Sequence, residues 1–162
     1  MGKDEIYEIL KKENIWFEIT EHEAVFNMEE ASKVDLPYPE FDAKNIFVRD
    51  DKKKNYYLIS FKSNKKVNLK EFQERYGTRR LSFASENDLM NIMKLIPGAV
   101  TPFGILNDSE NKVKFYLDKD FIGNRKIIGV HPNDNTATVW IKVNDLIDII
   151  EKHGTKVNIA QI

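Results

Sequence analysis

Hydrophobic positions along this chain follow two periods, one of three to four residues and one of two. Ile6, Ile9 and Leu10 recur at helical spacing within residues 3–12 and predict a short amphipathic helix. Runs of β-branched and aromatic residues, bounded by turn-forming residues, predict strands instead. These runs are 15–20, 43–50, 56–61, 81–84, 113–118 and 137–141. Because the elements mix without a strict strand–helix–strand rhythm, the pattern predicts an α+β fold with a mixed or mainly antiparallel sheet.

Capping residues and stop signals predict further helices between these strands. The expected helices cover 27–34, 68–76, 85–96 and 144–153. In the third of them, Ser85 is the cap, the apolar face extends to Ile96, and Pro97 is expected to end the helix because it cannot continue the hydrogen-bond ladder. This places the next segment directly at a helix C-terminus.

That segment, residues 95–108 (LIPGAVTPFGILND), holds two of the chain's 7 glycines and two of its 5 prolines among apolar residues. Loops rich in Gly and Pro are usually polar and solvated, so this one is predicted to be a buried turn between a helix and a strand. Such a turn leaves the backbone N–H groups of Gly98, Ala99 and Val100 in need of a partner. Either the turn is only a rigid part of the core, or a ligand oxygen supplies that partner.

The composition narrows the class of protein. A chain of 162 residues, 41% hydrophobic, predicts one domain over 1–162 with a sizeable core. No apolar run could span a bilayer and the charged start is no signal peptide, so a soluble cytoplasmic protein without a membrane partner is expected. With no cysteine there is no disulfide, thiolate nucleophile or Cys-ligated metal, and the 3 histidines are not at helical ligand spacing. We therefore expect neither a metal nor a cofactor.

Charge is distributed unevenly along the chain. Residues 1–48 carry 5 Lys and Arg against 12 Asp and Glu, whereas residues 49–80 carry 11 against 4. The basic middle block is typical either of a surface that faces nucleic acid or of a solvated hairpin and helix. The candidate phosphate contacts in it are Lys52, Lys53, Lys54, Lys65, Lys66, Arg79 and Arg80.

Two residues stand out as candidates for chemistry. Lys44 opens the predicted strand 43–50, where a lysine is either a surface residue or a cation that stabilises an oxyanion or a phosphate. His131 precedes a proline and an Asn/Asp-rich turn, and it could be a general base, a ligand-binding group or a structural residue. Asn133 in that turn can bind a ligand or hold the turn together. No serine lies in a GxSxG context, which disfavours a covalent mechanism.

Three separated motifs then occur in a recognisable order: AKNIFVRD at 43–50, the apolar Gly/Pro segment at 95–108, and GVHPNDNTATVW at 129–140. With them, the chain resembles the YbaK/ProX family of bacterial aminoacyl-tRNA deacylases over about residues 7–150, and most of all its free-standing prolyl-tRNA editing branch. The resemblance implies a curved, barrel-like sheet flanked by helices. It also implies that deacylation depends on Lys44 and that His131 contacts substrate, with a general base as the minor alternative.

The function implied by this resemblance is trans-editing, in which mischarged tRNA(Pro), above all Ala-tRNA(Pro), is hydrolysed by a non-covalent attack of water. A synthetase pocket for proline cannot strongly reject the smaller alanine, so a second, smaller pocket removes the error. The expected substrate-binding residues are Gly98, Ala99, Val100, Thr101, Phe103, Gly104, His131 and Asn133.

Alternatives remain open at this level. The substrate could be Cys-tRNA(Pro), or the chain could be a non-catalytic sensor of aminoacyl-tRNA or an amino acid, or an interaction domain whose basic face binds a protein. The expected partner is the acceptor end of tRNA(Pro), with prolyl-tRNA synthetase or an elongation factor as a further candidate. The sequence leaves the oligomeric state open.

Overall fold

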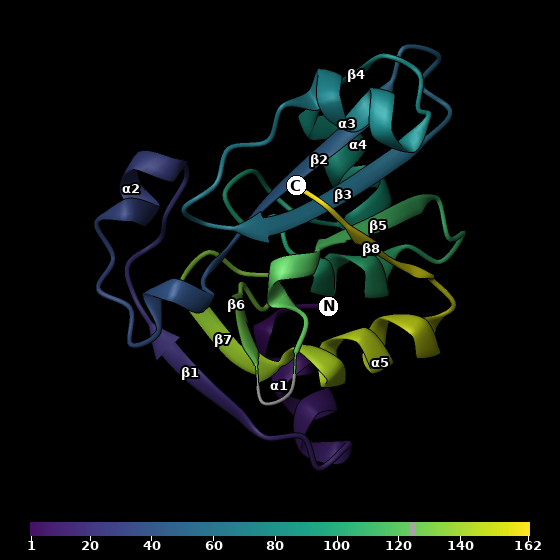
Figure 1. Ribbon diagram of the computed structural model, residues 1–162. Coiled ribbons are helices and arrows are strands. Elements are labelled where there is room, and N and C mark those ends of the chain that lie inside the picture. Colours follow the sequence, from purple (N-terminus) through teal and green to yellow (C-terminus); the bar gives the residue numbers. More distant parts are fainter. Residues whose placement is uncertain (124–125) are drawn as a thin grey trace.

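The computed structural model describes residues 1–123 and 126–162 (Figure 1). The helices are α1 (Lys3–Lys12), α2 (Met28–Ser32), α3 (Leu69–Tyr76), α4 (Glu86–Met93) and α5 (Val143–His153), with 3-10 helices η1 (Pro39–Phe41), η2 (Pro102–Asn107) and η3 (Lys119–Phe121). The strands are β1 (Phe17–Glu21), β2 (Ala43–Asp50), β3 (Tyr56–Lys62), β4 (Leu81–Phe83), β5 (Val113–Asp118), β6 (Ile127–Val130), β7 (Ala137–Lys142) and β8 (Val157–Ala160).

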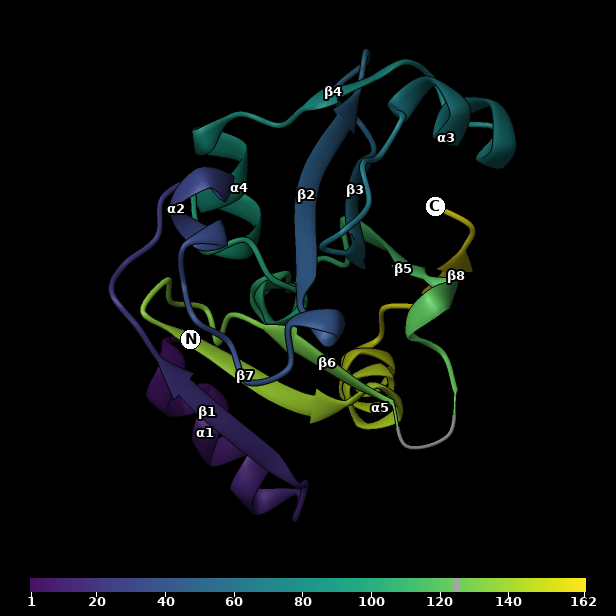
Figure 2. The same cartoon turned by 60° about the vertical axis from the view of Figure 1, so that its left-hand side comes forward.

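The strands form two sheets that cross each other (Figure 2). The five-stranded sheet has the order β4-β2-β3-β5-β8, in which β2 pairs antiparallel with β3 and β4, while β3–β5 and β5–β8 are parallel. The three-stranded sheet, β1-β7-β6, is antiparallel. An isolated parallel bridge between Asp42 and Gly129 joins the two sheets at the start of β2. The predicted α+β class with a mixed sheet is confirmed, although the two sheets do not close into a barrel.

The main hydrophobic core lies between the sheets and helices α1, α4 and α5. Phe103, Phe115 and Phe121 are the largest fully buried side chains of this core, and Trp140 is fully buried outside it. Trp140 on β7 covers Gly129, its register partner on β6, so closely that any Cβ at Gly129 would overlap the indole ring. Removing these large apolar surfaces from water supplies the dominant favourable term in folding.

A second, smaller core packs the other face of β2 and β3 against α3. Phe72 of α3 lies edge-to-face with Tyr116 of β5, with ring centroids 5.0 Å apart. The Asn68 side chain caps α3 by accepting from the Glu71 N–H, and Gly77 ends the helix with φ +66°, as predicted.

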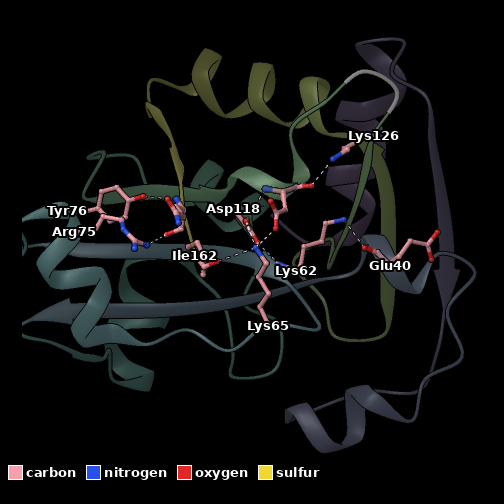
Figure 3. A network of polar contacts seen from close by, with 10 residues as sticks. Glu40, Lys62, Lys65, Arg75, Tyr76, Asp118, Lys126 and Ile162 are labelled. Atoms are coloured by element: carbon pink, nitrogen blue, oxygen red, sulfur yellow. Dashed lines mark hydrogen bonds and ion pairs between the residues drawn. The ribbon is translucent and has the colours of Figure 1, made fainter.

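A polar network fixes the C-terminus against the end of β3 (Figure 3). Lys65 lies 2.9 Å from the buried Asp118 carboxylate and 2.5 Å from that of Asp120, and its Nζ also donates to the Ile162 carbonyl at 3.3 Å. The Arg75 guanidinium donates to the Gln161 carbonyl at 3.0 Å. The Lys65 ammonium lowers the pKa of Asp120 by favouring its ionised form.

Most predicted helices and strands are confirmed, but several begin or end at other residues than predicted because local packing sets their boundaries. The helix after Ser85 ends at Met93, because Lys94 adopts a left-handed conformation with φ +56°, and Ile96 is 46% exposed instead of extending the apolar face. The first strand begins at Phe17 rather than at 15, because the Ile15 N–H still donates to the Leu10 carbonyl behind α1.

Other differences concern whole elements. Residues 102–107 form a 3-10 helix instead of a plain turn, and the short strands β6 and β8 were not predicted. The last helix begins at Val143, not at Asn144, and α2 is shorter than the predicted 27–34. Within 1–123 and 126–162, no helix combines the length and the apolar character needed to cross a bilayer.

Candidate active site

A cavity of about 370 Å³ lies beside the junction of the two sheets. Its walls come from the start of β2, from the β6–β7 turn and β7, and from the segment between β1 and β2 that carries α2 and η1 and passes beside β2 (Figure 2). The lining residues are His22, Val25, Ser32, Val34, Asp35, Leu36, Pro39, Asp42, Ala43, Lys44, Ser63, His131 and Thr138. Its size lies within the range of small-molecule sites, about 300–1,000 Å³.

Lys44 is the second residue of β2 and lies in the wall of this cavity. Its register partner on β3 is Phe61, and the next pair in the ladder is tied by a side-chain hydrogen bond from Ser60 to Asn45. This pairing holds the backbone beneath Lys44 in place. Among the described residues Lys44 forms no ion pair, so its ammonium is available to a ligand.

His131 enters the cavity from the opposite sheet. Its Nδ1 donates to the Ala137 carbonyl at 2.8 Å, which leaves Nε2 as an acceptor. Its own carbonyl accepts a hydrogen bond from the buried Thr101 hydroxyl at 2.5 Å. Burial lowers the pKa of His131, and the neighbouring His22 ring, 5.9 Å away between centroids, lowers it further. The imidazole is therefore neutral at pH 7 and presents an unprotonated nitrogen.

His22 is anchored in a similar way at the end of β1. Its two ring nitrogens lie 2.9 Å from the Glu23 carbonyl and 3.1 Å from Thr138 Oγ1. Because the carbonyl can only accept, Nδ1 donates to it, and Nε2 shares a hydrogen bond with the Thr138 hydroxyl. The two histidines thus form one side of the cavity, and hydrogen bonds to the ring and to the backbone of His131 hold it in place.

Asp42 is one of the polar cavity residues that sequence reasoning missed, with His22, Asp35 and Thr138. Burial raises the pKa of its carboxyl to about 7, an effect that the Ala43 backbone N–H and the Lys44 ammonium only partly offset. The signal was present, because residues two apart on an extended strand lie on the same face, and Asp42 precedes Lys44 by two. The cavity therefore holds the Lys44 ammonium two residues from the Asp42 carboxyl group, and Asp35 supplies a second carboxyl group to its lining.

The apolar Gly/Pro segment lies behind the cavity and is not part of its lining. Gly98 has φ +89°, and a Cβ there would come within 2.5 Å of the Val25 carbonyl oxygen and 2.9 Å of Phe26 Cα. Only glycine fits this close backbone approach. The expectation that the Ala99 N–H lacks a protein partner is wrong, because it donates to the Ile96 carbonyl at 3.1 Å. Of the two interpretations given for this turn, a rigid part of the core or a ligand-binding loop, the first describes its packing.

The predicted substrate-binding residues therefore separate into two groups. Of that set, His131 lines the cavity. The others pack behind it and are Gly98, Ala99, Val100, Thr101, Phe103, Gly104 and Asn133. Thr101 holds the His131 backbone, while Asn133 donates to the Phe103 carbonyl at 3.5 Å and to the Met1 carbonyl at 3.2 Å.

Asn135, by contrast, acts directly on the cavity wall. Its side-chain amide donates to the Val25 carbonyl at 2.8 Å, and its backbone carbonyl accepts from the Val25 N–H at 3.2 Å. The β6–β7 turn thereby fixes the strand-like segment that carries Val25. Gly98 packs closely against the same carbonyl.

The basic block does not form one surface with the cavity. Lys52, Lys53 and Lys54 lie in the β2–β3 turn, at the opposite end of β2 from Lys44, a separation of about 20 Å at 3.3 Å per residue. Arg79 lies near them and forms a bidentate pair with Asp51 at 2.6 and 3.0 Å, and Arg80 follows it, exposed. At the other end of the hairpin, Lys65 is engaged in the C-terminal network and Lys66 is exposed.

Within the described ranges, no group of three or more His, Asp or Glu side chains has the geometry to hold a metal ion. The side chains that line the cavity supply an ammonium, two carboxyl groups, two imidazoles and hydroxyl groups.

Comparison with known proteins identifies the family of this chain. Residues 22–149 match the family described as the aminoacyl-tRNA editing domain. The chain is 39% identical to the prolyl-tRNA editing protein ProX of Acetoanaerobium sticklandii over 153 residues, which covers 94% of this chain and 93% of that protein. It is 31% identical to the prolyl-tRNA synthetase associated domain-containing protein 1 of Mus musculus over 140 residues, covering 85% and 82% of the two chains.

Among solved structures, the crystal structure of a candidate trans-editing enzyme for prolyl-tRNA synthetase superposes with a TM-score of 0.71 at 15% identity, covering 98% of this chain and 94% of that one. At that identity the match shows the shared fold. The resemblance noted from the three sequence motifs is thus confirmed by an independent match over most of the chain. The chain belongs to the aminoacyl-tRNA editing domain family.

Proposed function

We propose that this protein is a trans-editing hydrolase that deacylates mischarged tRNA(Pro), with Ala-tRNA(Pro) as its preferred substrate. The observation that carries the proposal is the cavity at the junction of the sheets, in which Lys44 and His131 meet from separate sheets. The 39% identity to ProX, a prolyl-tRNA editing protein, over nearly the whole of both chains supports the assignment of the tRNA.

The reaction requires no covalent intermediate, because an aminoacyl ester is already activated. A water molecule attacks the ester carbonyl carbon, the carbonyl oxygen becomes an oxyanion, and the bond to the ribose oxygen then breaks as that oxygen takes a proton. Lys44 stabilises the developing negative charge or the adjoining phosphate. The unprotonated Nε2 of His131 accepts a hydrogen bond from the water or from a ribose hydroxyl and so orients it.

Size exclusion supplies the specificity. Missing methylene groups change binding by only about 1–3 kcal/mol, so a proline-sized synthetase pocket admits alanine. A second pocket that accepts alanine and excludes proline corrects the error. The wall segment carrying Val25 is held by hydrogen bonds to Asn135 and by the close packing of Gly98 on its backbone, so it cannot yield easily to a larger side chain. In this proposal the apolar segment behind the cavity sets its dimensions.

The tRNA is held in part away from the cavity. The lysines of the β2–β3 turn lie about 20 Å from Lys44 along β2, far enough to reach phosphates of the acceptor stem while the terminal adenosine occupies the cavity. Prolyl-tRNA synthetase or an elongation factor could present the substrate, which would compensate for a net charge of −1.

The test of this function is release of alanine from Ala-tRNA(Pro) by the purified protein. Lys44→Ala should lower kcat/KM by about 100-fold or more, the size of effect typical of removing an oxyanion-stabilising group. Lys156→Ala, which removes an exposed lysine outside the cavity, is the matched control and should leave the rate unchanged.

Two alternatives have distinct outcomes in the same assay. Faster release of cysteine from Cys-tRNA(Pro) than of alanine would change the substrate but keep the enzyme. Binding of aminoacyl-tRNA without release of any amino acid would favour the non-catalytic sensor and contradict the proposal.

A further inference from the structure

Asp42 is a cavity carboxyl group to which the hydrolysis described above assigns no role. Its backbone is fixed from three directions: its N–H donates to the Pro39 carbonyl at 3.3 Å, its carbonyl accepts from the Ser63 N–H at 3.0 Å, and it forms the bridge to Gly129 that joins the sheets. A side chain on so constrained a backbone is held at one place in the cavity wall.

The charged groups around this carboxyl leave it without a direct counter-charge. Lys44 lies two residues later, in β2, and the other titratable residues that line the cavity are His22, His131 and Asp35. In the described part of the chain, Asp42 forms no ion pair with any of these groups. A carboxylate drawn away from water without a counter-charge is costly, and a bound cation removes that cost.

We propose that Asp42 binds the α-ammonium group of the aminoacyl ester and thereby places the scissile carbonyl beside Lys44. The proposal rests on the function proposed above and names the part of the substrate that the cavity recognises. An aminoacyl ester carries its ammonium one carbon away from the carbonyl. Asp42 has an extended backbone directly before β2, so its Cα atom lies about 6.6 Å from that of Lys44. Because both residues line the same cavity, one substrate can engage both.

This arrangement makes a free amino group a requirement for fast hydrolysis. A substrate whose amine is acylated has no positive charge and adds bulk next to Asp42, so it cannot form the ion pair. The same site also gives a pH dependence, because protonation of Asp42 abolishes the attraction. The raised pKa of Asp42 places that loss just below neutral pH, with Lys44 and the two histidines as the other groups that face it.

The test compares Ala-tRNA(Pro) with N-acetyl-Ala-tRNA(Pro) on the wild-type protein and on Asp42→Asn. We expect the wild type to prefer the free amine, and Asp42→Asn to lose about 10- to 100-fold in kcat/KM on Ala-tRNA(Pro) alone, as for a lost hydrogen bond to a charged group. Asp148→Asn removes an exposed carboxylate on α5 and controls for the change in net charge toward tRNA. An equal loss on both substrates would overturn the proposal, since it would mean that Asp42 acts on the water or only on structure.

A binding measurement separates this proposal from the proposed function. Alaninamide, which carries the ammonium but no ester, should shift the NMR signals of cavity residues in the wild type and not in Asp42→Asn, and N-acetylalaninamide should shift neither. If the wild type hydrolyses no aminoacyl-tRNA but binds alaninamide through Asp42, the proposed function is refuted and the proposed ammonium site is supported. If alaninamide produces equal shifts in both proteins, or none in either, the ammonium site is refuted.

Discussion

Replacing Asp42 by Asn keeps the size of the side chain but removes its ionisation, so it isolates the free energy of holding a carboxylate in this cavity. The folded protein raises the pKa of Asp42 from its ordinary value of 3.8 to about 7, with burial as the main cause. A carboxyl whose pKa is raised by folding binds protons more tightly in the folded state than in the unfolded state. Its contribution to stability is therefore fully present below about pH 4 and is lost as the pH rises through about 7.

The size of this effect follows from the shift. At 1.36 kcal/mol for each pKa unit, a rise from 3.8 to about 7 corresponds to about 4 kcal/mol. Because Asp42 keeps some contact with water, we expect about 2–4 kcal/mol to be observed. Asp42→Asn stays neutral at every pH and escapes this loss. Because pH 4.5 already lies above the unfolded pKa of 3.8, the variant should gain about 2–3 kcal/mol relative to the wild type between pH 4.5 and pH 8.

The assay is urea denaturation of the wild type and Asp42→Asn at pH 4.5, 6, 7 and 8, followed by circular dichroism. Titration of all other groups is common to the two proteins, so it cancels in the difference between their free energies of unfolding. The difference should grow in favour of the variant across this range. A difference that is constant from pH 4.5 to pH 8 would refute the reasoning, since it would show that Asp42 titrates alike in the folded and unfolded chain.

Three further predictions concern the parts around the cavity. Gly98→Ala should lower the free energy of unfolding by about 2–4 kcal/mol, because φ +89° strains any side chain and the Cβ meets the Val25 carbonyl; a loss below about 0.5 kcal/mol in a denaturant titration would contradict the packing. Thr101→Val should cost about 1–2 kcal/mol and slow deacylation, because it removes the hydrogen bond that holds the His131 backbone; unchanged stability and rate would show that this bond is dispensable. Reversing the charge of the three lysines at 52–54 together should weaken the salt dependence of tRNA binding. The slope of log affinity against log salt concentration should fall by about one for each phosphate that the turn no longer neutralises, and an unchanged slope would show that this turn does not contact tRNA.

Local signals in the sequence were sufficient for much of the fold. The strand at 43–50 and the helix after Asn68 have the predicted boundaries, because period-two alternation and a capping residue are encoded in adjacent positions. Strands β6 and β8 were not predictable in this way. Each has only four residues, and each is defined by its pairing, with β7 and with β5 respectively, rather than by its own pattern.

The site was predicted in part for the same reason. Lys44 and His131 lie in recognisable motifs, and both line the cavity. The interpretation of Gly98 as a ligand contact depended on a buried turn whose backbone N–H groups need a partner, whereas the structure shows that the backbone of Val25 occupies the space beside Gly98. Sequence patterns report that a glycine is approached closely, but they do not report what approaches it. The two-residue spacing of Asp42 from Lys44 was visible in the sequence, but the raised pKa of Asp42 comes from burial, which only the tertiary structure supplies.

The central claim, that a small cavity at the junction of the two sheets hydrolyses a misacylated proline tRNA, is tested most directly by single-turnover deacylation of Ala-tRNA(Pro) and Pro-tRNA(Pro) side by side. We predict that alanine is released at least about tenfold faster than proline, because the fixed wall carrying Val25 admits the smaller group and excludes the larger. Equal rates for the two substrates, or release of neither, would contradict the account.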